Sequence, residues 1–286
     1  MNKYFGNPSG GRGDRQAGPG DSLAELYEAE GWSLSAAERE LLGKIAVACG
    51  EDFSWLPSTE GWYTKAGSSV GDFPAYVLIR CPVARMWGRV TEEMEDYRDE
   101  PFDGAHPVLR RSHYLAESQW STLLEILGSS PVTIGLWEGY GGLTAEEHPS
   151  WTIRVGEALG LRRGSDLPLR MSRLPAALLA TEPILTPDRA FYVLRSTLPA
   201  FHDFLSWREA NPAVCFPDLV EAKEWRAACD VDAACVVIGC SPELAERLVA
   251  SPGLWAQRVA GSDPILTCFD EGTEDDPIEG EDVAEP

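Results

Sequence analysis

Apolar residues follow a helical spacing in two short segments near the start of the chain. Segments 22–29 and 35–49 each open with a serine that is followed three residues later by a glutamate, a pairing that caps the first turn of a helix. Apolar residues then recur every three or four positions, and Gly50 suits the end of the second segment. The pattern predicts two amphipathic helices ahead of the main body of the chain.

Five largely apolar segments further along have the length of buried strands, and they are 75–81, 132–136, 151–155, 190–194 and 235–238. Helical spacing returns at 87–94, 120–127 and 242–249, and the last of these follows Ser241 as its N-cap. Strands and helices follow one another without a regular alternation. We therefore predict an α/β or α+β fold with a mixed sheet flanked by helices, an N-terminal helical extension and disordered ends.

The two ends of the chain differ in composition from its middle. Residues 1–20 hold six glycines and two prolines, which predicts a disordered arm. Residues 270–286 carry nine acidic residues and no basic one, which predicts a disordered acidic tail. Between them, residues 21–269 are apolar enough for a single globular domain, in which 21–50 forms the helical extension.

The 286-residue chain has a net charge of −22, and residues 21–269 alone carry −15. A field of this sign repels phosphate groups, so it argues against nucleic acids and anionic membranes as partners. No apolar run approaches the roughly 18 residues that a membrane span needs. The charge favours a basic protein as the partner, and solubility alone is the simpler explanation.

The cysteines and the polar start of the chain predict a cytoplasmic protein. Seven cysteines occur without a Cys-x-x-Cys pair, and residues 1–20 lack the apolar stretch of a signal peptide. Reduced thiols are therefore expected. The histidines lack metal-binding spacing, and no phosphate-binding glycine motif follows a strand, so we predict neither a metal nor a cofactor. Cys240 precedes a helix N-terminus, which lowers a thiol pKa, but we favour a structural role for it.

The strand predicted at 132–136 runs into a glycine-rich turn, Trp137-Glu138-Gly139-Tyr140-Gly141-Gly142. Glycine lets a backbone come close to whatever lies beside it, so Trp137, Glu138 and Tyr140 are candidate binding residues. The flanking aromatic rings would exclude water from Glu138 and raise its pKa, which would suit proton transfer. A purely structural role, with the Glu138 carboxylate fixing the turn, is the simpler explanation.

Two aspartates form a second candidate site. Asp230 and Asp232 are two residues apart, so on a strand they would share a face and could bind a hard cation or act as an acid–base pair. If Glu138 lay beside them, the three carboxylates would form one cluster. Exposed turn residues are the simpler explanation for two aspartates at the end of a strand.

Several segments resemble an uncharacterised family of bacterial proteins. The most distinctive is Leu-Trp-Glu-Gly-Tyr-Gly at 136–141, and the others are 70–76, 189–192, 225–232, 238–241 and 251–255. The resemblance implies a shared fold over roughly residues 70–258, and it carries no mechanism because the family has no assigned activity. The chain departs from the family pattern at three points: at Cys215-Phe216 the family has two tryptophans, at Cys229-Asp230 it often has threonine and glutamate, and at Cys240 it usually has glycine.

Three functions compete on these observations. The best supported is a non-catalytic acidic protein of the cytoplasm that binds a basic protein partner, as immunity and inhibitor proteins do. The second is an enzyme with a carboxylate site at Glu138, Asp230 and Asp232. The third is a structural or regulatory domain. The lack of a recognisable catalytic motif favours the first over the second.

Overall fold

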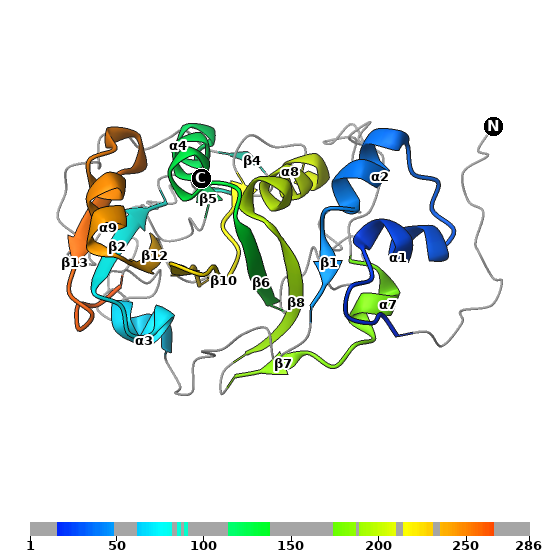
Figure 1. Ribbon diagram of the computed structural model, residues 1–286, viewed down its shortest axis with the longest axis horizontal. Coiled ribbons are helices and arrows are strands. Elements are labelled where there is room, and N and C mark those ends of the chain that lie inside the picture. Colours follow the sequence, from blue (N-terminus) through cyan, green and yellow to red (C-terminus); the bar gives the residue numbers. More distant parts are fainter. Residues whose placement is uncertain are drawn as a thin grey trace, which may run out of the picture.

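The computed structural model describes residues 16–48, 62–81, 85–86, 89–90, 114–137, 174–186, 189–209, 214–230 and 235–265. Nine strands in these residues form one sheet: β1 (Ala46–Val47), β2 (Ala75–Arg80), β6 (Pro131–Trp137), β7 (Ile184–Leu185), β8 (Ala190–Thr197), β10 (Leu219–Glu221), β11 (Arg226–Ala228), β12 (Cys235–Cys240) and β13 (Ala256–Val259). Their order is β1-β8-β6-β10-β11-β12-β2-β13, with β7 also beside β8 (Figure 1).

Helices and two further strand pairs complete the described part of the chain. The helices are α1 (Leu23–Ala29), α2 (Ala36–Leu42), α3 (Ala66–Val70), α4 (Glu117–Leu127), α7 (Ala176–Leu179), α8 (Leu198–Glu209) and α9 (Pro242–Val249), with short 3-10 turns η2 (Trp62–Thr64) and η5 (Pro252–Leu254). The separate pairs are β3 (Arg85–Met86) with β4 (Arg89–Val90) and β5 (Tyr114–Leu115) with β9 (Val214–Cys215).

The fold is α+β, one of the two alternatives that the sequence predicted. All strand pairs among the described residues are antiparallel, so the sheet itself is antiparallel rather than mixed as predicted. Antiparallel neighbours can be joined by short turns, so the chain needs no helix between each strand and the next. This explains why helices and strands do not alternate regularly along the sequence.

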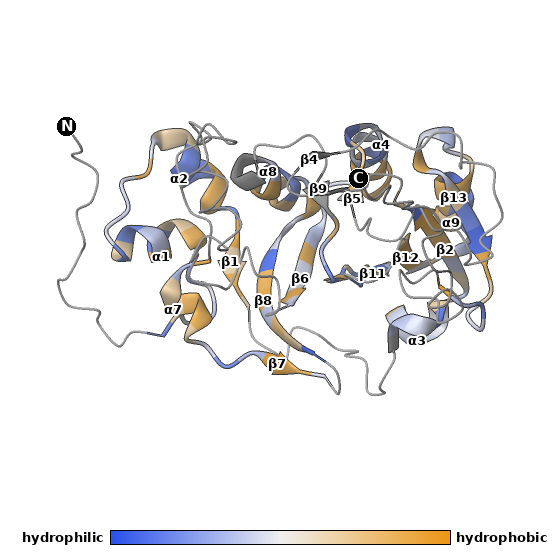
Figure 2. Cartoon of the chain, turned by 180° about the vertical axis from the view of Figure 1, so that it is seen from behind, coloured by the Kyte–Doolittle hydropathy of each residue, from blue (hydrophilic) through white to orange (hydrophobic). Residues whose placement is uncertain are grey.

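The middle strands of the sheet are apolar on both faces, and helices cover each face. All residues of β12 and nearly all of β2 are buried. Figure 2 colours hydrophobic residues orange, and both strands contain them. On one face the sheet packs against α4, α8 and α9, where the ring of Trp120 stacks on that of Phe216 at 5.3 Å between centroids. On the other face a smaller cluster surrounds α3, with Ala66 and Val70 against Leu78 of β2. The molecule therefore has three layers, as Figure 1 shows.

The two capped helices predicted near the start are confirmed. The backbone N–H groups of Ser22 and Ser35 donate to the carboxylates of Glu25 and Glu38 at 2.8 and 2.7 Å, and the serine hydroxyls accept from the backbone N–H groups of the same glutamates. These reciprocal bonds satisfy donors that a helix N-terminus otherwise leaves without a partner. Both helix starts are thus decided by residues within three positions of each other.

The end of the second helix was predicted wrongly. Helix α2 ends at Leu42, before Gly43, and Ala46 and Val47 form strand β1 beside β8. Pairing with β8 satisfies the backbone groups of this segment at the edge of the sheet, which outweighs its helical spacing of apolar residues. The helical extension therefore contributes a strand to the main sheet.

Residues 16–20, which the composition assigned to the disordered arm, pack against the body of the molecule. Ala17 is buried, and its backbone N–H donates to the carbonyl of Ala177 at 3.0 Å. The N–H of Gly20 donates to the carbonyl of Val47 at 2.8 Å. The remainder of the predicted arm and the predicted acidic tail lie outside the described residues.

Most of the predicted elements in the body are confirmed. Strands β2, β6, β8 and β12 coincide with four of the five apolar runs, and α4 and α9 coincide with two of the three helical segments. The helix predicted at 87–94 is wrong where the structure describes it, because β3 and β4 pair there as an antiparallel ribbon. The strand predicted at 151–155 lies outside the described residues.

Candidate functional site

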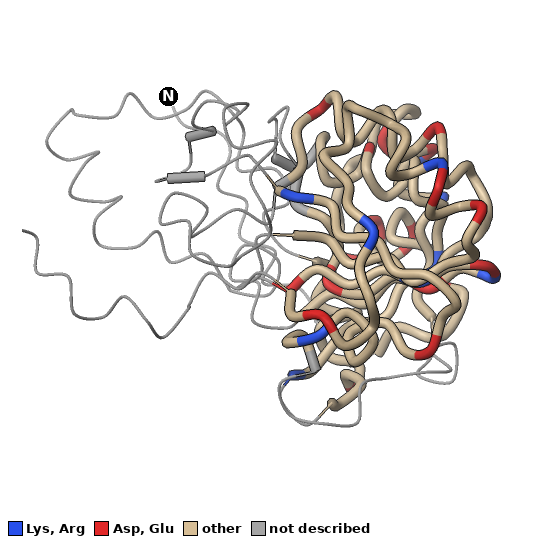
Figure 3. Tube along the Cα trace, turned by 90° about the vertical axis from the view of Figure 1, so that its left-hand side faces the viewer, with Lys and Arg blue, Asp and Glu red and all other residues tan. Residues whose placement is uncertain are grey.

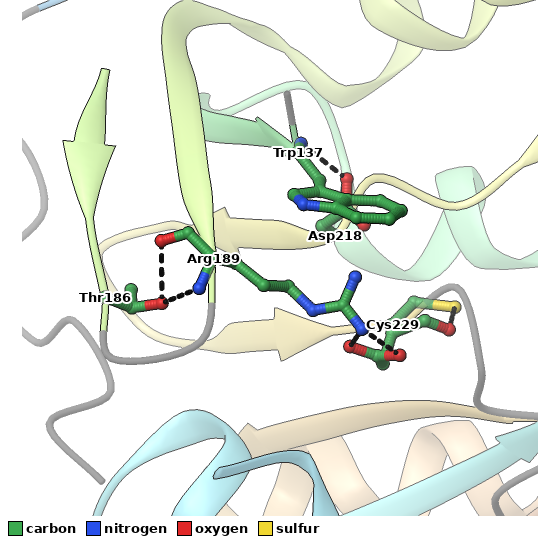
Figure 4. Close-up of polar contacts among 6 residues, drawn as sticks. Trp137, Thr186, Arg189, Asp218 and Cys229 are labelled. Carbon is green, nitrogen blue, oxygen red and sulfur yellow. Dashed lines mark hydrogen bonds and ion pairs between the residues drawn. The ribbon is translucent and has the colours of Figure 1, made fainter. Parts of the chain in front are cut away.

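Four strands begin or end at one end of the central sheet and bring distant side chains together. Strand β6 ends at Trp137 beside the start of β8, and β10 begins beside the end of β11. Because these neighbours are antiparallel, residues just outside the strand ends meet in space. Trp137, Arg189, Asp218 and Asp230 gather there, and we call these four residues the sheet-end cluster (Figure 4).

An ion pair between Arg189 and Asp230 forms the centre of the sheet-end cluster. Nη2 of Arg189 lies 2.9 Å from Oδ1 and 2.7 Å from Oδ2 of Asp230, and only 9% and 1% of the two side chains are exposed. The guanidinium also lies over the ring of Trp137, 4.3 Å from its centroid, and 5.7 Å from the ring centroid of Tyr63. A buried charge is unfavourable unless it is paired, and aromatic faces attract a cation further. Arg189 therefore neutralises Asp230 and packs on Trp137 at the same time.

A tight connection between β7 and β8 fixes the backbone of Arg189. The hydroxyl of Thr186 accepts from the N–H of Arg189 at 3.1 Å and donates to its carbonyl at 3.0 Å. The N–H of Thr186 donates to the same carbonyl at 2.8 Å. These bonds between Thr186 and Arg189 (Figure 4) set the position from which the Arg189 side chain reaches Asp230.

Asp218 is the most perturbed group of the cluster. Its Oδ2 accepts from the backbone N–H of Trp137 at 3.0 Å, whereas its Oδ1 is buried and has no hydrogen-bond partner among the described residues. Burial raises the pKa of the Asp218 carboxyl to about 7, and the negative charge of Asp230 adds to this effect. The Trp137 N–H and the Arg189 charge act in the opposite direction without overcoming it. Asp218 can therefore gain and lose a proton near neutral pH.

The thiols near this end of the sheet are protonated rather than reactive. A hydrogen bond with Cys81 and then burial hold the pKa of the Cys229 thiol well above its usual value, and the nearby Asp218 and Asp230 add to the effect. At the other end of β12, burial raises the pKa of Cys240 to about 11. This overcomes any effect of the following helix N-terminus, and it agrees with the structural role favoured from the sequence.

Of the five binding residues predicted from the sequence, the structure describes two. Trp137 and Asp230 both belong to the sheet-end cluster, where Arg189 lies between them. Asp230 lies just beyond the end of β11 rather than within a strand. Glu138, Tyr140 and Asp232 lie outside the described residues. The binding role of all five stays a prediction.

Sequence reasoning missed Arg189 and Asp218 as members of this site. Each had a weak signal, because Arg189 opens one of the segments that carry the family resemblance and Asp218 follows Cys215-Phe216-Pro217, where the chain departs from the family pattern. Neither signal indicates that the two residues meet. Only the register of β6, β8, β10 and β11 brings them together.

The arrangement suits proton exchange at Asp218 better than cation binding. Both oxygens of Asp230 are close to Arg189, so this carboxylate is already neutralised. In the part of the chain that the structure describes, no three His, Cys, Asp or Glu side chains are arranged to hold a metal ion.

No helix among the described residues has the length and apolar content to cross a bilayer. Comparisons with known protein families, curated proteins and solved structures give no match for this chain.

Proposed function

We propose that the protein is a non-catalytic, cytoplasmic protein that binds a basic protein partner, in the manner of immunity and inhibitor proteins. The observation that carries the proposal is the charge of −22 on a chain of 286 residues. Among the described residues, exposed acidic side chains outnumber exposed Lys and Arg. Figure 3 shows positions of both charges at many points along the trace. Such a field attracts cationic partners and repels phosphates, so it speeds association with the former.

The ion pair of Asp230 with Arg189 weakens the hypothesis of an enzyme with a carboxylate site at Glu138, Asp230 and Asp232. Asp230, one of the three carboxylates of the enzyme hypothesis, is neutralised by Arg189 and is 1% exposed. The thiols of Cys81, Cys229, Cys235 and Cys240 form no disulfide in the described part of the chain, in keeping with a reducing compartment.

Capture from native extract followed by reconstitution tests the proposal. The tagged full-length chain is incubated with extract at low ionic strength, and retained proteins are eluted with a salt gradient and identified. We expect a basic protein that then binds the purified chain at a 1:1 ratio in calorimetry, with an affinity that falls as salt rises. A chain that stays monomeric and retains no protein at low salt contradicts the proposal.

An enzyme is the second candidate, and the position of Asp218 favours it. The candidate acid–base pair is Asp218 with Asp230, because Asp230 is paired with Arg189 while burial favours the protonated form of Asp218. Two carboxyls with opposite protonation states are typical of sites that transfer protons.

Chromogenic esters, phosphate esters and glycosides are suitable substrates to test for such an activity. Turnover that is lost in Asp218→Asn and kept in the exposed control Asp203→Asn would support this candidate, and equal turnover in both would exclude Asp218 as its acid.

A further inference from the structure

The carboxyl of Asp218 is held between groups from three different strands. Its Oδ2 binds the N–H of Trp137 at the end of β6, and its backbone carbonyl accepts from the N–H of Cys229 after β11 at 2.9 Å. The charged groups that act on it are Asp230, from the same end of β11, and Arg189, from the start of β8. Asp218 thus links β6, β10 and β11 where these strands end.

The ionised form of Asp218 does not suit these surroundings. A carboxylate needs donors for both oxygens, and Oδ1 of Asp218 has none among the described residues and is not in contact with water. Arg189 does not compensate for this, because its Nη2 lies within 2.9 Å of both oxygens of Asp230. A neutral carboxylic acid avoids the burial of a second negative charge beside Asp230.

We propose that Asp218 makes this end of the sheet a proton-operated switch. The closed arrangement holds Asp218 as the neutral acid, and loss of its proton opens the ends of β6, β10 and β11 to water, which then solvates Oδ1. The proton leaves to solvent, and no other co-reactant is involved. The inference concerns the inside of the molecule and does not depend on the proposed binding of a basic partner.

Asp230 and Arg189 set the pH at which the switch operates. Asp230 opposes ionisation of Asp218 because the two charges have the same sign, whereas Arg189 favours it. In Asp230→Asn the like charge is removed and Arg189 keeps its full attraction for Asp218. The variant should therefore switch at a lower pH than the wild type. The thiol of Cys229 stays protonated over this range, because its hydrogen bond with Cys81 and its burial hold its pKa well above the usual value.

Carbon NMR and amide hydrogen exchange on the full-length chain test the switch. The side-chain carboxyl signal of Asp218, assigned by its absence in Asp218→Asn, should titrate near pH 7 rather than near pH 4. Across the same range, the amides of Trp137 and Cys229 should lose protection after correction for the intrinsic pH dependence of exchange. Amides in the centre of β12 should keep theirs.

Variants separate the switch from general effects of pH. Asp218→Asn imitates the neutral acid and should stay protected at Trp137 and Cys229 from pH 5 to pH 9. Asp203→Asn, on α8 with a side chain that is 69% exposed, should behave as the wild type. The proposal is overturned if the Asp218 carboxyl is already ionised at pH 5. It is also overturned if Asp218→Asn loses protection with pH as the wild type does.

Discussion

At the scale of single residues, the buried carboxyl of Asp218 makes the stability of the protein depend on pH. In the unfolded chain this group has its usual pKa of 3.8, and in the folded protein burial raises that pKa to about 7. The folded state therefore binds more protons between these values, so the contribution of Asp218 to stability is fully present below pH 3.8 and is lost as pH rises through 7. A shift of about three units corresponds to roughly 4 kcal/mol at most.

Replacing Asp218 by Asn should remove this dependence. At pH 8 we expect Asp218→Asn to unfold with a free energy that is higher than that of the wild type by about 1–4 kcal/mol, and at pH 4 we expect nearly equal values. Urea denaturation of both proteins at several pH values measures the difference. A variant that is equally destabilised at pH 4 and pH 8 would show that Asp218 is ionised in the folded protein throughout.

Removing one partner of the Arg189–Asp230 ion pair should lower the free energy of unfolding far more than removing both partners. Arg189→Gln leaves the Asp230 charge buried without its cation, and we expect a loss of about 3–5 kcal/mol in the free energy of unfolding. The double variant with Asp230→Asn should recover most of this loss, because no unpaired charge remains. Urea denaturation of both variants and the wild type completes the double-mutant cycle.

A surface pair provides the matched control for this cycle. Arg39 and Glu28 lie 2.6 Å apart, but their side chains are 56% and 37% exposed. Solvent screens such a pair, so Arg39→Gln should cost less than about 1 kcal/mol. Equal losses of unfolding free energy in Arg39→Gln and Arg189→Gln would mean that breaking the buried ion pair costs no more than breaking an exposed one.

At the scale of elements, helix α3 and the segment that follows it approach strand β12 so closely that only glycine fits at position 239. A Cβ added to Gly239 would lie 2.5 Å from Cδ2 of Phe73 and 2.8 Å from Cγ2 of Val70. Gly239→Ala should therefore push α3 away from the sheet and lower the free energy of unfolding by about 1–3 kcal/mol. In Gly18→Ala the new Cβ meets its nearest neighbour, Oδ2 of Asp21, at 3.8 Å, so this variant should stay within about 0.5 kcal/mol of the wild type. Thermal or urea unfolding of both variants decides the matter.

Elements whose causes are local were predictable from the sequence, and elements that depend on distant partners were not. Ser22 and Ser35 lie three residues from the glutamates that cap them, so α1 and α2 begin where the sequence predicts. By contrast, Ala46 and Val47 become a strand because Leu194 and Arg195 lie beside them, about 150 residues away in the chain. The same holds for the site: Asp230 was identified as a carboxylate of interest, but its pairing with Arg189 depends on the register of four strands.

At the scale of the whole molecule, the C-terminal end of the chain has the densest negative charge, although residues 21–269 carry more of it in total. The tail of residues 270–286 carries nine of the 46 acidic residues and no compensating base. Charge acts at a distance by raising the local concentration of a cationic partner, and this effect needs no fixed geometry. The effect of the tail charge can therefore be tested separately from the fold.

Neutralising the tail should slow association with cations and leave folding unchanged. With its nine acids replaced by Asn and Gln, the chain keeps a charge of −13 out of −22. At low ionic strength we expect a lysine-rich probe peptide to associate roughly tenfold more slowly, and at high salt the difference should vanish because the field is screened. Stopped-flow fluorescence measures the association rates, and the midpoint of thermal unfolding should be the same for both chains.

A control chain whose tail has the same residues in reversed order keeps the charge and should keep the association rate. If reversal slows association as much as neutralisation does, the tail acts through a specific sequence rather than through its field.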